Sequence, residues 1–191
     1  MTSPEGVETL KQLLPYGEST VIETVIQKLK AAGLKTIVTV LGHHAVQITE
    51  PVSRHQAEIV INPDYQQGML TSIQAGIGFT LDIHASQTDG FLLCLVDQPG
   101  LRPETMRTIM QTAAAYPGKI IIPAFQDHKG HPVYIPVEFA DEILALPPDQ
   151  GLRALMQQHP EAIQLVPLDD SWIIRDMDTP EDYQAALREL S

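Results

Sequence analysis

The sequence has little positive charge, a single cysteine and few aromatic residues. Its 191 residues include 12 Lys and Arg against 24 Asp and Glu, which gives a formal net charge of -12. Nucleic-acid binding depends largely on Lys and Arg that displace counterions from phosphates, so this balance argues against a protein that binds the phosphate backbone of nucleic acids. It also repels anionic nucleotides at long range, so a phosphate site here needs a divalent cation and a few local basic groups. We therefore expect Mg²⁺ as a cofactor.

The single cysteine and the lack of long apolar runs argue against a disulfide-bonded protein and against a membrane-spanning protein. Cys94 has no partner for an intrachain disulfide and lies in an apolar run, so we interpret it as a small buried hydrophobic residue. No stretch approaches the roughly 18 to 20 apolar residues that cross a bilayer. The first residues also lack the apolar segment of a secretion signal. These absences predict a cytoplasmic protein without a membrane-spanning helix.

The composition is that of an ordinary folded domain, with 43% hydrophobic and 19% charged residues. At this length we predict a single domain over residues 1–191. Periodicity and capping residues predict helices at 20–32, 68–78, 103–115, 138–146, 151–159 and 180–190. Thr71 or Ser72 is expected to cap the second of these helices, and Thr179 the last.

Apolar and β-branched runs predict strands between these helices, at 36–41, 58–61, 91–96, 119–123, 131–135, 163–166 and 172–175. The first of them consists only of apolar or β-branched residues, as in a strand buried on both faces of a parallel sheet. The alternation of strands and helices predicts a doubly wound α/β fold. We expect a mostly parallel, Rossmann-like sheet with one antiparallel strand late in the chain, where the alternation breaks down.

Acidic residues follow two of the predicted strands, at the edge where ligands bind in open α/β sheets. Asp97 follows the strand at 91–96, while Asp176 and Asp178 follow the strand at 172–175. If they meet at one edge of the sheet, these carboxylates form a magnesium site for phosphate chemistry. Alternatively, Asp97 caps a turn and Asp178 makes a local hydrogen bond to the start of the last helix. The spacing alone leaves both interpretations open.

Five motifs follow one another along the chain from Lys11 to its end. They are Lys11–Gly17, Asn62–Ser72, Leu95–Pro103, Lys129–Pro132 and Asp176–Tyr183. In this order they resemble the MobA-like nucleotidyltransferases, and in particular the molybdenum-cofactor cytidylyltransferase branch. The resemblance implies a nucleotidyltransferase fold and the Mg²⁺-dependent transfer of CMP from CTP to a molybdopterin-type cofactor, with release of pyrophosphate. GTP and ATP are the alternative nucleotides.

The resemblance also implies roles for the charged residues of these motifs. Asp97 would hold the Mg²⁺ ion, and Asp178 or Asp176 would complete its coordination. Lys11 would steady the negative charge that develops on the phosphates. Without the resemblance, Lys11 would be interpreted as a solvated surface lysine.

The segment after Pro63 is implied to lie against the base and the ribose of the nucleotide. Its implied contacts come from Gly68, Met69 and Ser72, where a glycine permits close backbone approach and a serine offers a hydroxyl. The Gly-Met form of this loop favours cytidine over guanosine. From the residues alone, the same segment is an ordinary capped helix start.

The turn Lys129, Gly130 and His131 is implied to face the second substrate. Many relatives carry arginine at the position of Lys129, so a point charge replaces a planar fork and the phosphate contact is less specific. His131 could equally be a turn residue whose ring is satisfied by local hydrogen bonds.

Members of the family begin with an apolar strand and a loop, Ala-Ala-Gly-x-Ser-x-Arg-Met-Gly, that cradles the triphosphate; neither occurs in these 191 residues. We expect Met1 to correspond to the methionine of this loop, as in an N-terminally truncated chain. Without the central first strand, its neighbours must keep unpaired backbone edges or close up on each other. We expect weak CTP binding and slow turnover.

Two other functions remain open at this point. One is a nucleotidyltransferase that acts on another small phosphate. The other is a catalytically silent protein that binds the pterin cofactor, with a molybdoenzyme or its maturation factor as partner.

Overall fold

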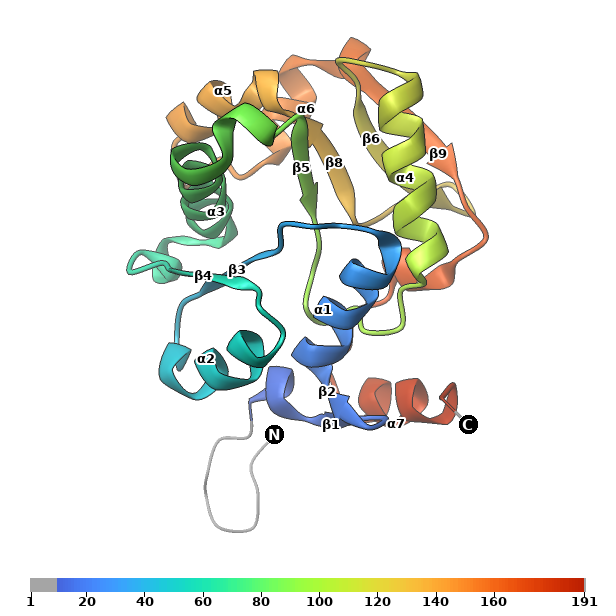
Figure 1. Cartoon of the computed structure of the whole chain (residues 1–191). Coiled ribbons are helices and arrows are strands. Elements are labelled where there is room, and N and C mark those ends of the chain that lie inside the picture. Colours follow the sequence, from blue (N-terminus) through green and yellow to red (C-terminus); the bar gives the residue numbers. More distant parts are fainter. Residues whose placement is uncertain (1–9, 191) are drawn as a thin grey trace.

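The computed structural model describes residues 10–190 and shows strands in the middle of the molecule with helices around them (Figure 1). The helices are α1 (Val21–Ala32), α2 (Ala45–Arg54), α3 (Met69–His84), α4 (Pro103–Ala115), α5 (Ala140–Ala145), α6 (Arg153–Gln158) and α7 (Pro180–Arg188). The strands are β1 (Pro15–Tyr16), β2 (Ser19–Thr20), β3 (Val38–Leu41), β4 (Glu58–Ile61), β5 (Gly90–Leu93), β6 (Ile120–Phe125), β7 (His128–Lys129), β8 (Val133–Pro136) and β9 (Ile163–Pro167).

The largest sheet has the order β5-β8-β6, with β9 on the far side of β6 and the two-residue β7 at its end. β8 is antiparallel to both β5 and β6, whereas β9 is parallel to β6. Strands β5, β6 and β9 therefore run in one direction with β8 reversed between them. This arrangement confirms the predicted α/β fold with a mostly parallel sheet and an antiparallel strand late in the chain.

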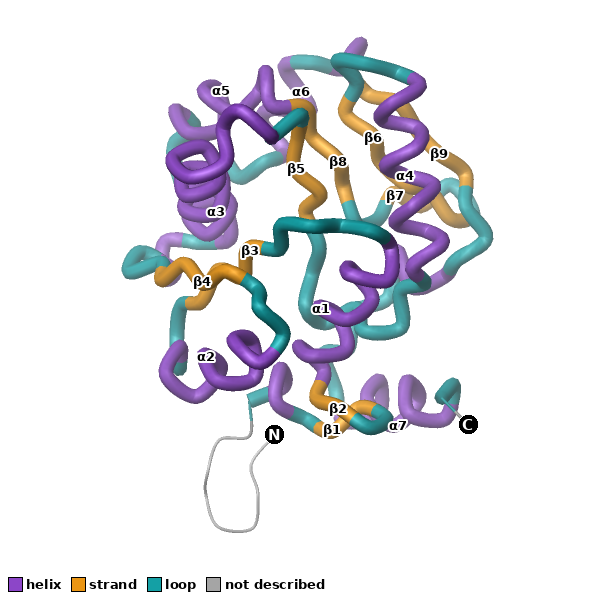
Figure 2. The backbone as a smooth tube through the Cα atoms, viewed as in Figure 1, coloured by secondary structure: helices purple, strands orange, loops and turns teal. Residues whose placement is uncertain are grey.

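Strands β3 and β4 form a separate parallel pair (Figure 2). Among residues 10–190, no strand pairs with the edge of β3 opposite β4 or with the edge of β5 opposite β8. A cleft of about 1280 Å³ lies between the two open edges and is lined by residues of β3, of 90–96 and of α1, α3 and α4. We call it the β3–β5 cleft. We expected that the neighbours of an absent first strand either keep unpaired backbone edges or close up on each other. Within residues 10–190, the facing edges of β3 and β5 are unpaired.

The unpaired edges of β3 and β5 explain why two strands are shorter than predicted. The strand predicted at 36–41 begins at Val38, and Val38, Thr39 and Val40 are only half-buried because they line the cleft. The strand predicted at 91–96 ends at Leu93. Cys94 and the two residues after it continue along the cleft without a partner strand in the described chain, so they lack the ladder that defines a strand.

Local sequence accounts for the ends of several helices. Thr20 and Glu23 form a capping box at the start of α1, and Gly33 ends this helix with a φ of 101°. A second capping box, made by Thr179 and Asp182, begins α7 as predicted for Thr179. These helices lie within one residue of their predicted starts.

Helix α2 was not predicted, and it contains Pro51 although proline disfavours helix interiors. Tertiary packing of Ile48 and Val52, which are 5% and 0% exposed, stabilises it nonetheless. The cap predicted for α3 was also wrong. The N-cap residue of this helix is Gly68, which has no side chain to cap it, while the hydroxyl of Thr71 inside the helix donates to the Gly68 carbonyl.

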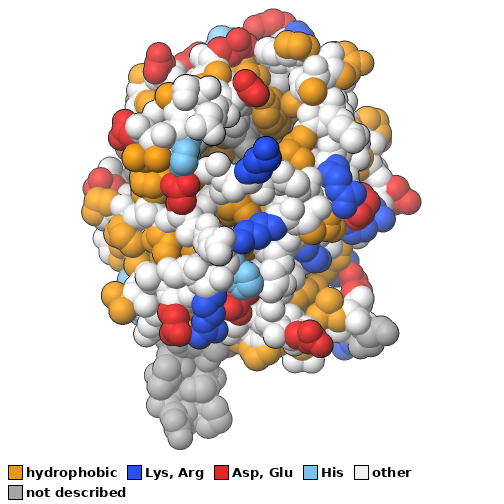
Figure 3. Space-filling model, viewed as in Figure 1, with side chains coloured by type: hydrophobic (Ala, Val, Ile, Leu, Met, Phe, Trp, Pro, Cys, Tyr) orange, Lys and Arg blue, Asp and Glu red, His pale blue; other side chains and the backbone are white. Residues whose placement is uncertain are grey.

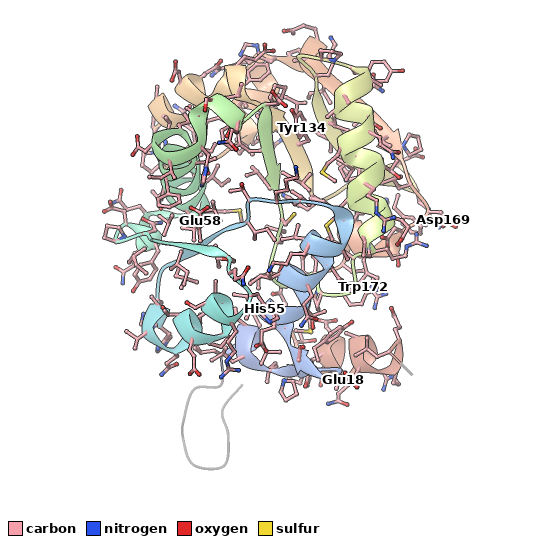
Figure 4. The ribbon with its side chains drawn as sticks, in the orientation of Figure 1. Glu18, His55, Glu58, Tyr134, Asp169 and Trp172 are labelled. Atoms are coloured by element: carbon pink, nitrogen blue, oxygen red, sulfur yellow. The ribbon has the colours of Figure 1, made fainter. Side chains whose placement is uncertain are left out.

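The strand predicted at 172–175 is instead a 3₁₀ turn at Ser171–Ile174. The Asp170 carboxylate accepts a hydrogen bond from the backbone N–H of Trp172 and begins the turn. Trp172 (labelled in Figure 4) packs against Gly100, where any Cβ atom would overlap the indole ring. Its ring Nε1–H donates to Glu189 of the segment that follows α7. These contacts hold the segment as a turn across the end of the sheet.

The buried apolar residues form two main clusters on either side of the β3–β5 cleft. One joins α1, α2 and the C-terminal part of the chain, with Val21, Val52 and Ile173 at its centre. The other joins α3, α5 and α6 to the large sheet, with Ile135, Ile143 and Leu155 fully buried. No helix within residues 10–190 is long and apolar enough to cross a membrane.

Candidate functional site

Asp97 lies just beyond β5, at the carboxyl edge of the sheet. Its backbone carbonyl accepts a 2.9 Å hydrogen bond from the N–H of Met177, which ties this edge to the C-terminal segment. Its carboxylate oxygen Oδ1 is buried and has no hydrogen-bond partner within residues 10–190. Burial raises the pKa of Asp97, and the nearby Asp176 carboxylate raises it further. The surroundings of Asp97 therefore disfavour its ionised form, and a bound cation would stabilise that form.

Asp176 and Asp178 flank Met177, so the bond between Met177 and Asp97 brings both of them to this site. Asp178 accepts a 2.7 Å ion-pair hydrogen bond from Lys11 Nζ, between side chains that are 63% and 36% exposed. The Lys11 charge also lowers the pKa of Asp97, against the effects of burial and of the two other carboxylates. Residues 167 positions apart in the sequence thus share one site.

Gln98 is a member of this site that the sequence interpretation did not select. It is 2% exposed, and its Nε2–H donates to Asp176 Oδ1 at 2.9 Å. The Nε2 group also lies 3.4 Å from the carbonyl oxygen of Ile173. Gln98 therefore fixes the orientation of Asp176. The sequence feature that could have identified Gln98 is its position directly after Asp97, at the end of the apolar run 91–96.

Two residues of the motif Lys129–Pro132, Gly130 and His131, lie against the same site. The N–H of His131 donates to the Ile173 carbonyl at 2.8 Å, and a Cβ atom on Gly130 would overlap that carbonyl oxygen. Gly130 is thus required by close packing. Burial lowers the pKa of the His131 ring, although Asp176 and Asp97 act in the opposite direction. Lys129 lies one residue earlier, in β7, and is exposed.

The segment Gly68–Ser72 lies at the N-terminus of α3. Gly68 has a φ of 114°, which favours glycine, and Met69 is 64% exposed. Asn62 is 3% exposed and organises this segment: its Nδ2 group donates to Thr71 Oγ1 at 2.9 Å and to Ser72 Oγ at 3.0 Å. Asn62 belongs to one of the five motifs, but the sequence alone gives it no role.

The structure therefore brings together two groups of candidate residues. Lys11, Asp97, Asp176, Asp178, Gly130 and His131 gather at the carboxyl edge of β5, while Gly68, Met69 and Ser72 belong to the start of α3. Met69, Ser72 and His131 all line the β3–β5 cleft, so this cleft connects the two groups. Among residues 10–190, no hydrogen bond or ion pair joins the side chain of Lys129 to either group, and Lys129 is exposed in β7. Figure 3 shows the molecule hollowed on one face, with hydrophobic side chains at the bottom of the hollow.

The carboxylates are suitable ligands for a divalent cation, although they do not form a complete coordination site in this structure. Within residues 10–190, no group of three or more His, Cys, Asp or Glu side chains is close enough to hold a metal ion. Asp176 is engaged by Gln98, and Asp178 by Lys11. Asp97 Oδ1, buried and without a partner in the same range, is the atom that a cation would satisfy.

Comparison with known proteins identifies a family and several relatives. Residues 6–163 match the profile of the MobA-like NTP transferase domain. The chain is 29% identical over 185 residues to nicotine blue oxidoreductase of Paenarthrobacter nicotinovorans, an alignment that covers 93% of this chain and 87% of that protein. It is 28% identical over 179 residues to molybdenum cofactor cytidylyltransferase of Escherichia coli, with coverage of 92% and 86%.

Solved structures share the fold over nearly the whole chain. The Mycobacterium tuberculosis protein Rv0371c, crystallised in complex with manganese, superposes with a TM-score of 0.77 at 25% identity and covers 93% of this chain and 91% of its own. A nucleotidyl transferase of Methanothermobacter superposes with a TM-score of 0.78 at 22% identity, with coverage of 97% and 87%. The latter shows the likeness of fold alone.

Proposed function

Because the chain belongs to the MobA-like NTP transferase family, a family of nucleotidyltransferases, we propose that it transfers CMP from CTP to a molybdopterin-type cofactor and releases pyrophosphate, with Mg²⁺ as the metal. The observation that carries this proposal is the buried Oδ1 of Asp97, which has no hydrogen-bond partner within residues 10–190 and lies next to the carboxylates of Asp176 and Asp178. The Escherichia coli relative, named for this transfer, supports the choice of nucleotide and acceptor. The Mycobacterium tuberculosis structure with manganese supports a divalent cation.

In this proposal the side chains position groups and balance charge. Asp97, with Asp178 or Asp176, would hold the ion, which when bound neutralises charge on the triphosphate and on the leaving pyrophosphate. Lys11, held beside Asp178, would stabilise negative charge on the phosphates. The phosphate oxygen of the pterin attacks the α-phosphorus in line, and little covalent work is left to the protein.

The walls around this edge would bind the two substrates. Gly68, Met69 and Ser72 would contact the base and ribose, where Asn62 holds the Ser72 hydroxyl in place. Lys129, Gly130 and His131 would face the pterin phosphate. Because burial lowers the pKa of His131, its ring would be neutral at pH 7 and would act as a hydrogen-bonding group.

We also propose that these 191 residues by themselves bind CTP weakly and turn it over slowly. The Ala-Ala-Gly-x-Ser-x-Arg loop does not occur in the sequence, so the triphosphate lacks backbone donors that a net charge of -12 cannot replace. Titration calorimetry with CTP and Mg²⁺ tests this proposal. We expect a dissociation constant weaker than about 0.1 mM, and submicromolar binding would contradict it.

The relative named an oxidoreductase shows that this fold is not tied to one reaction. We favour nucleotidyl transfer because the site groups three carboxylates and a lysine, which suit a cation and phosphates. The competing proposals are transfer to another small phosphate and a catalytically silent protein that binds the pterin cofactor for a molybdoenzyme or its maturation factor. We further propose a cytoplasmic protein of one domain over residues 1–191.

A transfer assay distinguishes these proposals. Radiolabelled CTP is incubated with molybdopterin, Mg²⁺ and micromolar protein, and labelled product and pyrophosphate are both measured. We expect slow formation of both, abolished in Asp97→Asn and unchanged in Asp141→Asn, whose carboxylate lies exposed on α5. Equal turnover by Asp97→Asn would refute the assigned role. Cofactor binding without any product would favour the silent protein.

A further inference from the structure

Residues 97–100 form a loop on which the candidate metal site depends. The loop presents the Asp97 carboxylate, and its Gln98 side chain donates to Asp176. The N–H of Leu101 donates to the Gln98 carbonyl at 3.2 Å, which closes the loop as a turn. The positions of two proposed metal ligands, Asp97 and Asp176, therefore depend on how this loop is held in place.

The C-terminal part of the chain holds the loop at two points. At one, the N–H of Met177 donates to the Asp97 carbonyl. At the other, Gly100 lies so close to the indole ring of Trp172 that a Cβ atom would overlap it. Pro99 lies between these two points and is buried. Its carbonyl oxygen therefore needs a hydrogen-bond donor from the protein.

Lys28, in the middle of α1, supplies this donor. Its Nζ donates to the Pro99 carbonyl at 2.5 Å, across 71 positions of sequence. Figure 1 shows the chain after β5 passing beside α1 at this point. The contact ties the loop of the candidate site to a helix on the other side of it, where the C-terminal segment does not reach.

The surroundings of Lys28 disfavour its charge. The side chain is half-buried, and burial lowers the pKa of its ammonium group, while the carboxylate of Asp170 acts in the opposite direction. Taking an ammonium group out of water costs free energy, and an apolar side chain at this position would avoid that cost. What a lysine adds here is the hydrogen bond to the loop.

Lys28 is not placed to bind a substrate. The residues of α1 that line the β3–β5 cleft are Ile22, Val25, Ile26 and Leu29. Among the described residues, the charges that act on the pKa of Asp97 are those of Asp176, Lys11 and Asp178. Lys28 therefore influences the site through the backbone of the loop and not through its own charge.

We propose that Lys28 is a positioning residue, which holds the Pro99 carbonyl and so fixes the loop 97–100 in the arrangement that lets Asp97 and Asp176 bind one divalent cation. Groups outside the first ring of ligands commonly orient those ligands in this way. The inference rests on the proposed function, because the cation is the one assigned to nucleotidyl transfer.

Binding of Mn²⁺ without nucleotide, followed at pH 7 by electron paramagnetic resonance of the free ion, tests the proposal. Lys28→Met removes both the charge and the donor. Loss of a positive charge by itself strengthens cation binding, whereas release of the loop weakens it, so the two roles predict opposite signs. We expect Lys28→Met to bind Mn²⁺ about tenfold more weakly than the wild type. Lys30→Met, which removes an exposed lysine from the same helix, should not weaken binding.

A conservative variant separates positioning from a general loss of stability. Lys28→Arg keeps a positive charge and hydrogen-bond donors, so it should restore most of the affinity for Mn²⁺. The measured affinity is that of folded molecules, and circular dichroism establishes that each variant is folded under the conditions of the titration. A variant that is merely less stable would then bind Mn²⁺ like the wild type.

Amide exchange in the metal-free protein gives a second readout. The N–H groups of Leu101 and Met177 donate to carbonyls of the loop. We expect both amides to exchange about tenfold faster in Lys28→Met, as local opening becomes easier. The amides of Glu58 and Asn62, which donate to carbonyls at the two ends of β3, should change much less.

The outcomes distinguish this inference from the proposed function. Mn²⁺ binding by Lys28→Met as tight as that of the wild type, or unchanged exchange at Leu101 and Met177, would overturn the role of Lys28 and leave the proposed function standing. Equal binding of Mn²⁺ by the wild type and Asp97→Asn would refute the cation site itself, and with it both proposals.

Discussion

At the scale of single residues, Asp97 carries a charge in surroundings that disfavour it. Burial raises its pKa, and Asp176 raises it further. A carboxyl group whose pKa is higher in the folded than in the unfolded protein destabilises the fold once it ionises. This penalty is absent below the usual pKa of 3.8, grows as the pH rises through the raised folded pKa, and is complete above it.

We therefore predict that Asp97→Asn is more stable than the wild type at pH 7 in the presence of EDTA. The difference should shrink as the pH falls toward 4, because the wild-type carboxyl group then becomes neutral. Urea denaturation at pH 4 and at pH 7 measures both values, with Asp141→Asn as an exposed control. A variant less stable than the wild type at pH 7 would show that the Asp97 charge already has a stabilising partner.

Lys11 is the second residue for which we expect a substitution to affect activity much more than stability. Its ion pair with Asp178 is largely exposed, with side-chain exposures of 36% and 63%, and such pairs contribute about 0.2–1 kcal/mol. Lys11→Met should therefore lower the free energy of unfolding by less than about 1 kcal/mol while it reduces CMP transfer roughly 100-fold. Lys30→Met, on the exposed face of α1, is the matched control. Unchanged transfer by Lys11→Met would remove Lys11 from the catalytic site.

At the scale of elements, α1 is held by its capping box and forms part of the cleft wall. Burial alone would raise the pKa of Glu23, but the hydrogen bonds from Thr20 and the charges of His55 and Arg54 together outweigh it, and the net pKa is lowered. A lowered carboxyl pKa stabilises the fold above the usual value of 4.5, and this contribution is lost as the pH falls through the lowered folded pKa.

Thr20→Ala should thus destabilise the protein by about 1 kcal/mol at neutral pH. The loss should be smaller at pH 3, below the usual pKa of 4.5, because the contribution of the lowered pKa of Glu23 is lost as the pH falls. Thermal denaturation followed by circular dichroism at the two pH values measures the difference. Thr108→Ala, inside α4, provides a control that removes a threonine hydroxyl without removing a cap. A loss that does not depend on pH would exclude the contribution of Glu23.

At the scale of the whole molecule, the net charge of -12 opposes the binding of any nucleotide. Salt weakens long-range repulsion, since the Debye length falls from about 30 Å at 0.01 M to about 8 Å at 0.15 M. The association rate of CTP should therefore rise between these salt concentrations, unlike the fall seen for electrostatically steered binding. Stopped-flow measurements with a fluorescent CTP analogue test this expectation. A rate that falls with salt would reveal a local positive field at the site.

Most elements could be predicted from local patterns, because periodicity, caps and apolar runs act over a few neighbouring residues. Thr20, Gly33 and Thr179 mark helix ends that the structure confirms. The prediction was wrong where distant contacts override local preference. Packing keeps a helix around Pro51, and the Asp170 cap with the Trp172 contact turns a strand-like segment into a 3₁₀ turn.

For the candidate site too, the sequence indicates some features and only the tertiary structure shows the others. The residue types, the acidic balance and the order of the motifs by themselves indicate carboxylates and a lysine for phosphate chemistry. Only the tertiary structure showed that Lys11 reaches Asp178, that Gln98 orients Asp176, and that Asp97 Oδ1 stays unpaired within residues 10–190. It also decided that β3 and β5 remain apart around an open cleft. Chain order specifies which groups are present, whereas the distances between them, and the backbone edges left open, depend on how the elements pack together.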